Sequence, residues 1–431
     1  MNFSEAMHYL MQKLPMFQRQ GKAALKPDLS NTIALMEGLG NPHFQFKSVH
    51  IAGTNGKGTS AHAIASILQA AGYSTGLYTS PHLKSFTERI RIGGKMISEE
   101  SVAAFVTKYQ SLIEEINPSF FEVTVAMAFD YFAREKVDIA VIETGLGGRL
   151  DSTNVIDPLV SLITMIDYDH ADILGNTLEK IAGEKAGIIK ANRPVVIGAD
   201  QPDLLHVFRQ KATSVNAHMS LAKHYQMEVI ANDGINQVIR VKASGNKEEE
   251  IIDFVTDITA EYFVKNLAGI LCTIDELVKA GFDINQKAIS KGLKKIKTST
   301  GLLGRWQLLS SEPKVFADIS HNIGGVSALL KQIDGTDYNH LHLVYGTVRD
   351  KEVDKILALL PKNANYYFTQ SHVPRSMAVE DLVEIAKTME IVGGSFENVN
   401  DAIDEAKKFA EKNDLIVVFG STFVVAEIDD L

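Results

Sequence analysis

The sequence predicts an α/β fold with two parallel sheets, the second smaller than the first. Short apolar stretches that are typical of buried strands alternate with longer stretches whose apolar residues recur at helical spacing. This alternation favours parallel strands with helices on both faces of each sheet. A turn-rich segment, residues 297–304, separates the two series of elements. We therefore expect one domain over residues 1–297 and a second over residues 298–431.

The composition is that of an ordinary globular protein. The chain has 431 residues, of which 45% are hydrophobic and 22% charged, so it can form two or three domains. Its formal net charge of −10 argues against a nucleic-acid binder with a generally basic surface. Cys272 is the only cysteine, so no disulfide can form within the chain. We recognise neither a signal peptide nor a membrane-spanning run, and we expect a cytoplasmic, monomeric enzyme with no membrane or nucleic-acid partner.

In the first domain, proline and glycine residues delimit several of the expected elements. Pro27 precedes one helix, Gly38 and Gly40 end it, and Gly93-Gly94 indicates a hairpin. The expected helices cover residues 3–13, 28–39, 99–116, 121–135, 262–278 and 284–296, with a further helix after the glycine-rich turn near residue 57. The expected strands cover residues 49–52, 74–78, 89–92, 95–97, 137–142, 159–166 and 194–198, and residues 200–255 are interpreted as a β insertion.

The second domain shows a cleaner alternation of strands and helices. This pattern predicts a smaller, Rossmann-like α/β domain. The expected strands are 314–319, 341–345, 366–370 and 415–419, and the expected helices are 324–333, 351–359, 378–389, 400–412 and a short terminal helix.

The stretch 49–60, VHIAGTNGKGTS, joins a buried strand to a helix through three glycines. Glycines let backbone N–H groups point inward and the helix N-terminus adds partial positive charge, so a phosphate fits there. Lys57 can reach the β- and γ-phosphates, and Thr59 or Ser60 can offer a hydroxyl to Mg²⁺. The strict phosphate-loop pattern is not met, because Ile51 occupies its first glycine position and a glycine follows the lysine. On this turn alone, a nucleotide site and a plain turn with an exposed lysine remain equally open.

Other polar residues follow the ends of neighbouring strands, where ligands gather in parallel sheets. Ser80 and His170 lie in such positions, and Glu143, also at a strand end, is a natural Mg²⁺ ligand. Taken singly, each has an ordinary structural role, and Lys185 fits a solvated helix lysine. Together with the glycine-rich turn they favour a nucleotide site in a P-loop ATPase-type parallel sheet domain.

Several stretches together resemble one enzyme family, the folylpolyglutamate synthase/dihydrofolate synthases of the Mur ligase superfamily. The resemblance covers nearly the whole chain, and GTNGKG is this family's own version of the phosphate loop. It rests on the stretches LGNPHFQFKSVHIAGTNGKGTS (39–60), YTSPHL (78–83), ERIRIGG (88–94), FFEVTVAMAFDYF (120–132), VIETGLGGRLDSTNV (141–155) and DHADILGNTLEKIAGEKAGIIK (169–190).

The resemblance implies a role for each matching residue. It implies catalytic roles for Lys57, Glu143, His170 and Lys185, of which Lys185 matches a lysine that is carbamylated in the superfamily. It implies two Mg²⁺ ions, held by Ser80, Glu143 and His170. It implies ATP contacts from Gly53, Thr54, Asn55, Gly56, Lys57, Gly58, Thr59, Asn266, Arg305 and Asp318. It implies contacts to the folate-type substrate from Ser119, Phe120, Phe121, Glu122, Leu150, Asp151, Ser152 and His321.

Two departures from the family pattern lie in its weaker part. Phe263 occupies a position where the family commonly has Gln, three residues before Asn266. Ile319 and Ser320 replace Gly and Ala after Asp318. The ATP contacts of Asn266 and Asp318 therefore depend on a less specific match.

The implied reaction is ATP-dependent amide formation. ATP converts the acceptor's carboxylate to an acyl phosphate, the amine of L-glutamate attacks it, and phosphate leaves. The first alternative is a cell-wall Mur ligase. The resemblance disfavours it, because such ligases carry a separate UDP-sugar domain and only about fifty residues precede the phosphate loop here. The second is a nucleotide-binding regulator without ligase activity, which the intact set of Lys57, Ser80, Glu143, His170 and Lys185 disfavours. The acceptor can be dihydropteroate, a reduced folate, or both.

Overall fold

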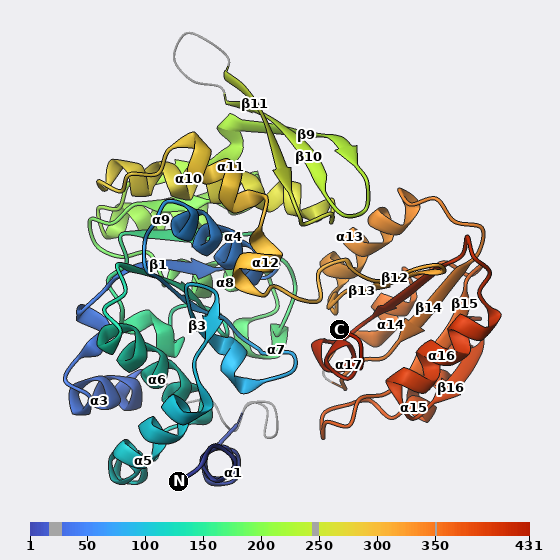
Figure 1. The fold of residues 1–431 in the computed structure, drawn as a ribbon, viewed down its shortest axis with the longest axis horizontal. Coiled ribbons are helices and arrows are strands. Elements are labelled where there is room, and N and C mark those ends of the chain that lie inside the picture. Colours follow the sequence, from blue (N-terminus) through green and yellow to red (C-terminus); the bar gives the residue numbers. More distant parts are fainter. Residues whose placement is uncertain (17–27, 244–249, 350) are drawn as a thin grey trace. The chain divides into compact units, whose positions relative to one another are not determined.

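The computed structural model describes residues 1–16, 28–243, 250–349 and 351–431 (Figure 1). The chain forms two compact units, which are described separately. The first contains residues 1–257 and 263–301, and the second contains residues 258–262 and 302–431. The α/β fold class expected from the sequence is confirmed, whereas the assignment of residues 1–297 and 298–431 to an ATP-binding and a ligase domain stays a prediction.

The main sheet of the first unit has the strand order β4-β3-β2-β5-β1-β6-β7-β8. The strands from β2 to β8 in this order are parallel, and β3 and β4 add an antiparallel edge. Ile51 of β1 lies opposite Glu143 of β5, so the phosphate loop and Glu143 leave the sheet at the same edge. The strands are β1 (Lys47–Ala52), β2 (Thr75–Tyr78), β3 (Ile90–Ile92), β4 (Lys95–Met96), β5 (Ile139–Glu143), β6 (Val160–Ile163), β7 (Val195–Ile197) and β8 (Met219–Leu221).

The helices of the first unit bury their apolar sides against this sheet and against each other. Phe129 and Phe132 are fully buried in one apolar cluster with Ala140 and Ile142 of β5, which anchors the helix that contains them beside the strand that ends at Glu143. The helices are α1 (Phe3–Lys13), α3 (Ser30–Gly38), α4 (Lys57–Ala70), α5 (Glu99–Ile116), α6 (Phe120–Arg134), α7 (Ala171–Leu174), α8 (Leu178–Ala186), α9 (Leu205–Ser214), α10 (Tyr262–Lys279), α11 (Gln286–Leu293) and α12 (Ile296–Thr300).

Two sequence predictions in this unit need correction. The β insertion is real, because β9 (Tyr225–Asn232), β10 (Gln237–Ala243) and β11 (Glu250–Thr256) form a separate antiparallel sheet (Figure 1). However, the predicted insertion also contains helix α9, and β8 joins the main sheet. The supposedly turn-rich segment 297–304 begins inside α12, where Ser299 and Thr300 are helical.

The second unit is a six-stranded sheet with the order β12-β13-β17-β14-β15-β16 among the described residues. Only β12 is antiparallel to its neighbour, and α16 packs along β15 and β16 (Figure 1). The strands are β12 (Gln307–Ser311), β13 (Lys314–Ala317), β14 (Leu341–Tyr345), β15 (Asn365–Thr369), β16 (Gly393–Phe396) and β17 (Leu415–Phe419). The helices are α13 (Ile323–Asp334), α14 (Val353–Leu357), α15 (Val379–Thr388), α16 (Val399–Phe409) and α17 (Thr422–Ala426).

The two edge strands of this sheet, β12 and β16, were not predicted. The sequence of β16, GGSF, has weak strand propensity. Its first glycine is required by close packing, since a Cβ on Gly393 would lie 2.5 Å from the carbonyl oxygen of Tyr366. Tertiary packing, not local preference, therefore makes this strand.

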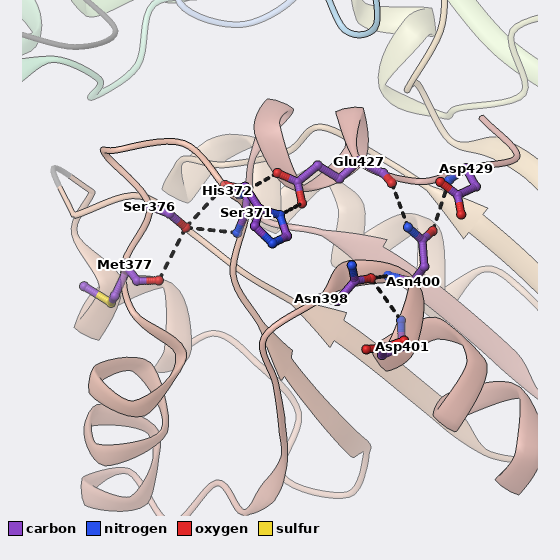
Figure 2. A network of polar contacts seen from close by, with 9 residues as sticks. All are labelled: Ser371, His372, Ser376, Met377, Asn398, Asn400, Asp401, Glu427 and Asp429. Carbon is purple, nitrogen blue, oxygen red and sulfur yellow. Dashed lines mark hydrogen bonds and ion pairs between the residues drawn. The ribbon is translucent and has the colours of Figure 1, made fainter.

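A polar network fixes the C-terminal residues to the loop after β15 (Figure 2). The carboxylate of Glu427 accepts a hydrogen bond from the backbone N–H of His372 and lies 2.8 Å from its Nδ1. Asn400 Nδ2 donates to the carbonyl oxygen of Glu427 at 2.9 Å, and Asn400 Oδ1 accepts from Asp429. The chain after α17 is therefore held in place by side chains of α16 and of the β15 loop. In the part of the chain that the structure describes, no helix has the length and apolarity needed to span a bilayer.

Candidate active site

The loop between β1 and α4 requires glycine at two positions. A Cβ on Gly53 would lie 1.8 Å from Thr164 Oγ1, and a Cβ on Gly56 would lie 2.3 Å from Asn266 Oδ1. Gly56 also has a left-handed backbone, with φ +92°, as the N-cap of α4. Thr164 Oγ1 donates to the carbonyl oxygen of Asn55 at 2.9 Å. The residue after β6 and a side chain of α10 thus shape the predicted phosphate loop.

The remaining loop residues are also held closely. Thr54 donates from its N–H to the carbonyl oxygen of Met165 at 2.7 Å and from its hydroxyl to that of Asp167 at 3.0 Å. Gly58 and Thr59 lie in the first turn of α4, and Thr59 is buried. The neighbouring Ser60 hydroxyl is buried without a hydrogen-bond partner among the described residues, so a ligand at this helix start would find an available donor.

Two lysines meet at the loop. Lys57 Nζ donates to the carbonyl oxygens of Gly53 (3.1 Å) and Thr54 (3.2 Å). Lys185 Nζ, which comes from α8, donates to the same Gly53 carbonyl at 2.8 Å. The structure therefore brings together two of the predicted catalytic residues that lie far apart in the sequence.

Lys185 is not the solvated lysine that its sequence context also allowed. Its side chain is 3% exposed. Burial, and then the positive charge of Lys57, lower the pKa of Lys185 to about 7, although Asp169 and Asp151 oppose this. A large fraction of this amine is therefore uncharged near neutral pH.

The end of β5 places Glu143 beside the loop that carries Ser80. Glu143 is buried, and its Oε2 accepts a hydrogen bond from the backbone N–H of Ser80 at 3.1 Å. Thr144, the next residue, has a buried hydroxyl with no hydrogen-bond partner in the described ranges. A buried carboxylate at a sheet edge, next to hydroxyl groups, is a suitable oxygen donor set for a hard cation.

His170 has a left-handed backbone, with φ +51°, at the start of α7. Its Nε2 lies 3.8 Å from Asp169 Oδ1. Asp169 was not predicted, yet its charge acts on Lys185, so the loop after β6 belongs to the same surroundings as the lysines. Among the described residues, no group of three or more His, Cys, Asp or Glu side chains is arranged to hold a metal ion by itself.

The predicted substrate segment 119–122 begins α6. Ser119 and Glu122 form a capping box: Ser119 Oγ accepts from the Glu122 N–H at 3.2 Å, and Glu122 Oε2 accepts from the Ser119 N–H at 2.6 Å. Phe120 is buried against the guanidinium of Arg89. Phe121 is partly exposed and lies over Gly145, where a Cβ would come within 2.4 Å of its ring. Phe121 therefore meets the loop after β5 with the Cζ edge of its ring.

The predicted substrate segment 150–152 closes the loop after β5. Leu150 is 38% exposed, whereas Asp151 and Ser152 are buried. Asp151 Oδ2 accepts hydrogen bonds from the N–H groups of Gly145 and Leu146, both at 2.8 Å. Burial raises the pKa of Asp151, although these hydrogen bonds oppose the change. Asp151 therefore orders the loop, a role that the sequence pattern did not reveal.

The predicted ATP contacts fall in both units. Asn266 lies in α10 beside Gly56, as described above, and Phe263 is fully buried core. In the second unit, Asp318 is buried; its Oδ2 accepts from the Tyr262 hydroxyl at 2.7 Å and from the Trp306 N–H at 2.8 Å.

The other two predicted residues of the second unit lie near Asp318 in the sequence. Arg305 donates to the carbonyl oxygens of Leu303 and Gly304, at 3.4 and 3.2 Å. His321 Nδ1 lies 2.8 Å from the carbonyl oxygen of Ile319, just before α13. All three roles implied by the resemblance stay predictions.

Comparisons with known proteins identify both halves of the chain. Residues 51–274 match the Mur ligase middle domain, and residues 304–422 match the Mur ligase glutamate ligase domain. The chain is 34% identical to a dihydrofolate synthase/folylpolyglutamate synthase of Bacillus subtilis (strain 168), over 94% of this chain and 95% of that protein.

Solved structures show the same similarity. A Mycobacterium tuberculosis folylpolyglutamate synthase complexed with ADP superimposes with a TM-score of 0.87 at 31% identity, over 98% of this chain and 96% of the other. The E. coli FolC in complex with DHPP and ADP gives a TM-score of 0.85 at 27% identity, over 99% and 96%.

Proposed function

Because the chain belongs to the Mur ligase family, and within it to the dihydrofolate synthase/folylpolyglutamate synthases, we propose how its residues carry out the family's reaction. The protein is an ATP-dependent ligase that joins glutamate to folates. We propose that the acceptor carboxylate, of dihydropteroate or a reduced folate, is activated as an acyl phosphate. The observation that carries this proposal is the meeting of Lys57 and Lys185 at one carbonyl of the phosphate loop.

The nucleotide lies, in this proposal, against the N-terminus of α4. The backbone N–H groups from Gly56 to Thr59 surround the phosphates, and Lys57 exchanges its carbonyl contacts for phosphate oxygens. Asn266 lies beside Gly56 and contributes a side-chain amide. Arg305 and Asp318 complete the ATP contacts in the proposed assignment.

The residues present fit Mg²⁺. Ser80 and Glu143 would hold one ion, and Glu143 and His170 would hold a second. The two ions would neutralise negative charge on the transferred phosphoryl group. Glu143 supports this assignment because its carboxylate is buried at the end of β5 and accepts a hydrogen bond from the backbone N–H of Ser80, the second proposed ligand.

Carbamylation of Lys185 also fits the residues. The modification needs an uncharged amine that attacks CO₂ and releases one proton, and burial beside Lys57 favours that form. The resulting anion would be attracted to Lys57, whereas the unmodified ammonium is repelled. Lys185 would then orient a metal ion or a phosphate.

The chemistry proceeds in two steps. An oxygen of the acceptor carboxylate attacks the γ-phosphorus of ATP, and ADP leaves. The uncharged amine of L-glutamate then attacks the acyl carbon; phosphate leaves as the amide forms, and the nitrogen loses a proton. Lys57 and Arg305 offset charge on the transferred phosphoryl group. Phe121 and the loop 145–152 would contact the ring system of the acceptor.

An acceptor panel tests the proposal. The purified protein is incubated with ATP, Mg²⁺ and L-glutamate plus dihydropteroate, tetrahydrofolate, or no acceptor, and ADP and the glutamylated product are measured. ADP release that requires both glutamate and one of these acceptors supports the proposal. ADP release without either, or no glutamylated product with active nucleotide turnover, contradicts it. We also propose that the protein acts as a monomer in the cytoplasm; light scattering during gel filtration tests the first part.

A further inference from the structure

A chain of hydrogen bonds runs from the centre of the main sheet to the loop after β5. His50 lies in β1 and is fully buried, and its Nε2 is 2.8 Å from Thr153 Oγ1. Thr153 Oγ1 is 2.5 Å from Asp151 Oδ1. The other oxygen of Asp151 accepts from the N–H groups of Gly145 and Leu146. We call His50, Thr153 and Asp151 the relay.

The direction of every bond in the relay is determined by chemistry. An ionised carboxylate can only accept hydrogen bonds, so the Thr153 hydroxyl donates to Asp151. The Thr153 Oγ1 atom then accepts a hydrogen bond from the Nε2–H of the neutral His50 ring. His50 Nδ1 is buried and has no hydrogen-bond partner among the described residues, which suits the ring nitrogen without a proton. Each hydrogen bond in this chain strengthens the next, from His50 through Thr153 to the Asp151 carboxylate that holds the loop.

The loop that the relay holds is connected to the rest of the candidate site. Gly145 lies against the Cζ edge of the Phe121 ring. Arg149 donates from its N–H to the carbonyl oxygen of Glu184 in α8 at 2.8 Å. The next residue of α8, Lys185, donates to the carbonyl oxygen of Gly53, the first residue after β1. The same strand, β1, thus supports the phosphate loop through its end and the loop after β5 through His50.

We propose that the relay positions residues 144–150 for the folate-type acceptor, so that Thr153 and His50 are positioning residues for acceptor binding. This inference rests on the proposed function. Asp151 has four donors in its own chain, from Gly145, Leu146 and, twice, Thr153. Loss of the Thr153 hydroxyl leaves a buried carboxylate oxygen without its shortest contact, and the loop relaxes to recover a partner.

Thr153→Val tests the relay, because valine has nearly the same shape and lacks the hydroxyl. Thr153→Ser keeps the hydroxyl and is the conservative rescue. Thr273→Val is the matched control: Thr273 is also fully buried, and its hydroxyl donates to the Gly269 carbonyl oxygen within α10 at 2.7 Å. The KM values for acceptor and ATP are measured for all three variants, with ADP affinity by calorimetry.

We expect Thr153→Val to raise the acceptor KM roughly tenfold while the KM for ATP and the ADP affinity stay unchanged. Thr153→Ser and Thr273→Val should keep wild-type acceptor KM values. An unchanged acceptor KM in Thr153→Val, or the same increase in Thr273→Val, overturns the inference.

A second measurement does not depend on turnover. Hydrogen exchange of the peptide containing Gly145 and Leu146 should quicken in Thr153→Val and in His50→Phe, which removes the ring donor, but not in Thr273→Val. Unchanged exchange in whichever of the two relay variants folds would refute the relay. If instead the wild-type protein glutamylates no folate acceptor while exchange quickens as expected, the proposed function fails and the relay remains as loop support.

Discussion

Lys185 should reduce the stability of the protein while it serves the reaction, and Lys185→Met tests this. The buried amine has a pKa of about 7, compared with an ordinary value of 10.5. Between these two values the unfolded chain binds the proton more tightly than the folded protein does. The stability of the wild type should therefore rise with pH across this window and fall as pH drops toward 7.

The difference in pKa corresponds to about 5 kcal/mol between the protonated and deprotonated limits. At pH 7 roughly 4 kcal/mol of this free energy opposes folding in the wild type, and replacing the lysine by methionine removes that destabilisation. The variant also loses the hydrogen bond to the Gly53 carbonyl oxygen, which reduces its gain in stability by about 1 kcal/mol. Lys185→Met should thus be more stable than the wild type by roughly 3 kcal/mol at pH 7, and this gain should vanish near pH 10.

The assay is urea unfolding followed by far-UV circular dichroism, from pH 7 to pH 10, in buffer freed of CO₂ so that the amine stays unmodified. Lys180→Met is the matched control, because Lys180 lies on the exposed side of the same helix and its replacement should change stability by less than about 0.5 kcal/mol. Ligation should be lost in Lys185→Met and kept in Lys180→Met. The burial argument would be refuted if Lys185→Met were less stable than the wild type at pH 7. It would also be refuted if the difference in the free energy of unfolding between variant and wild type were the same at every pH.

Three further outcomes concern the phosphate loop and the metal. Lys57→Ala should weaken ADP binding about 10- to 100-fold by calorimetry, since a charged donor to phosphate is lost; unchanged affinity would place the nucleotide elsewhere. Glu143→Gln should raise the Mg²⁺ concentration needed for half-maximal ADP release roughly tenfold or more, and a wild-type Mg²⁺ titration would exclude Glu143 as a ligand. Gly56→Ala should abolish tight ADP binding because its Cβ would collide with Asn266. Gly72→Ala is the control: Gly72 has a similar positive φ but open space around it, so this variant should lose only about 1 kcal/mol of stability. Equal ADP affinities in the two variants would contradict the steric argument.

The strand ends could be located from sequence because they depend on local patterns. Apolar runs that stop at a polar residue predicted that Glu143 and the phosphate loop share one edge of the sheet, and the register of β1 and β5 confirms it. Edge strand β16 escaped prediction because its first glycine, Gly393, is required by contact with Tyr366 of β15, which a local pattern does not contain.

Long-range partners could not be read from the sequence. Position 53 must be glycine because a Cβ there would collide with the side chain of Thr164, which lies more than a hundred residues later in the sequence. The burial of Lys185 depends on how α8 meets the phosphate loop, so its local sequence was equally compatible with a solvated position. His50 did leave a signal, since it is a polar residue within an apolar strand, but its partner Thr153 becomes evident only in the folded chain.

The short segment 258–262 has a consequence for how this protein can be taken apart. It belongs to the second unit, yet the chain on both sides of it belongs to the first. The Tyr262 hydroxyl bonds to Asp318, and the Glu261 N–H donates to Gln332 Oε1 at 2.6 Å. A fragment that starts at residue 302 loses both donors and leaves a buried carboxylate short of a partner. Residues 302–431 therefore cannot be exchanged alone between relatives. A chimera should take residues 258–262 and residues 302–431 from the same parent protein.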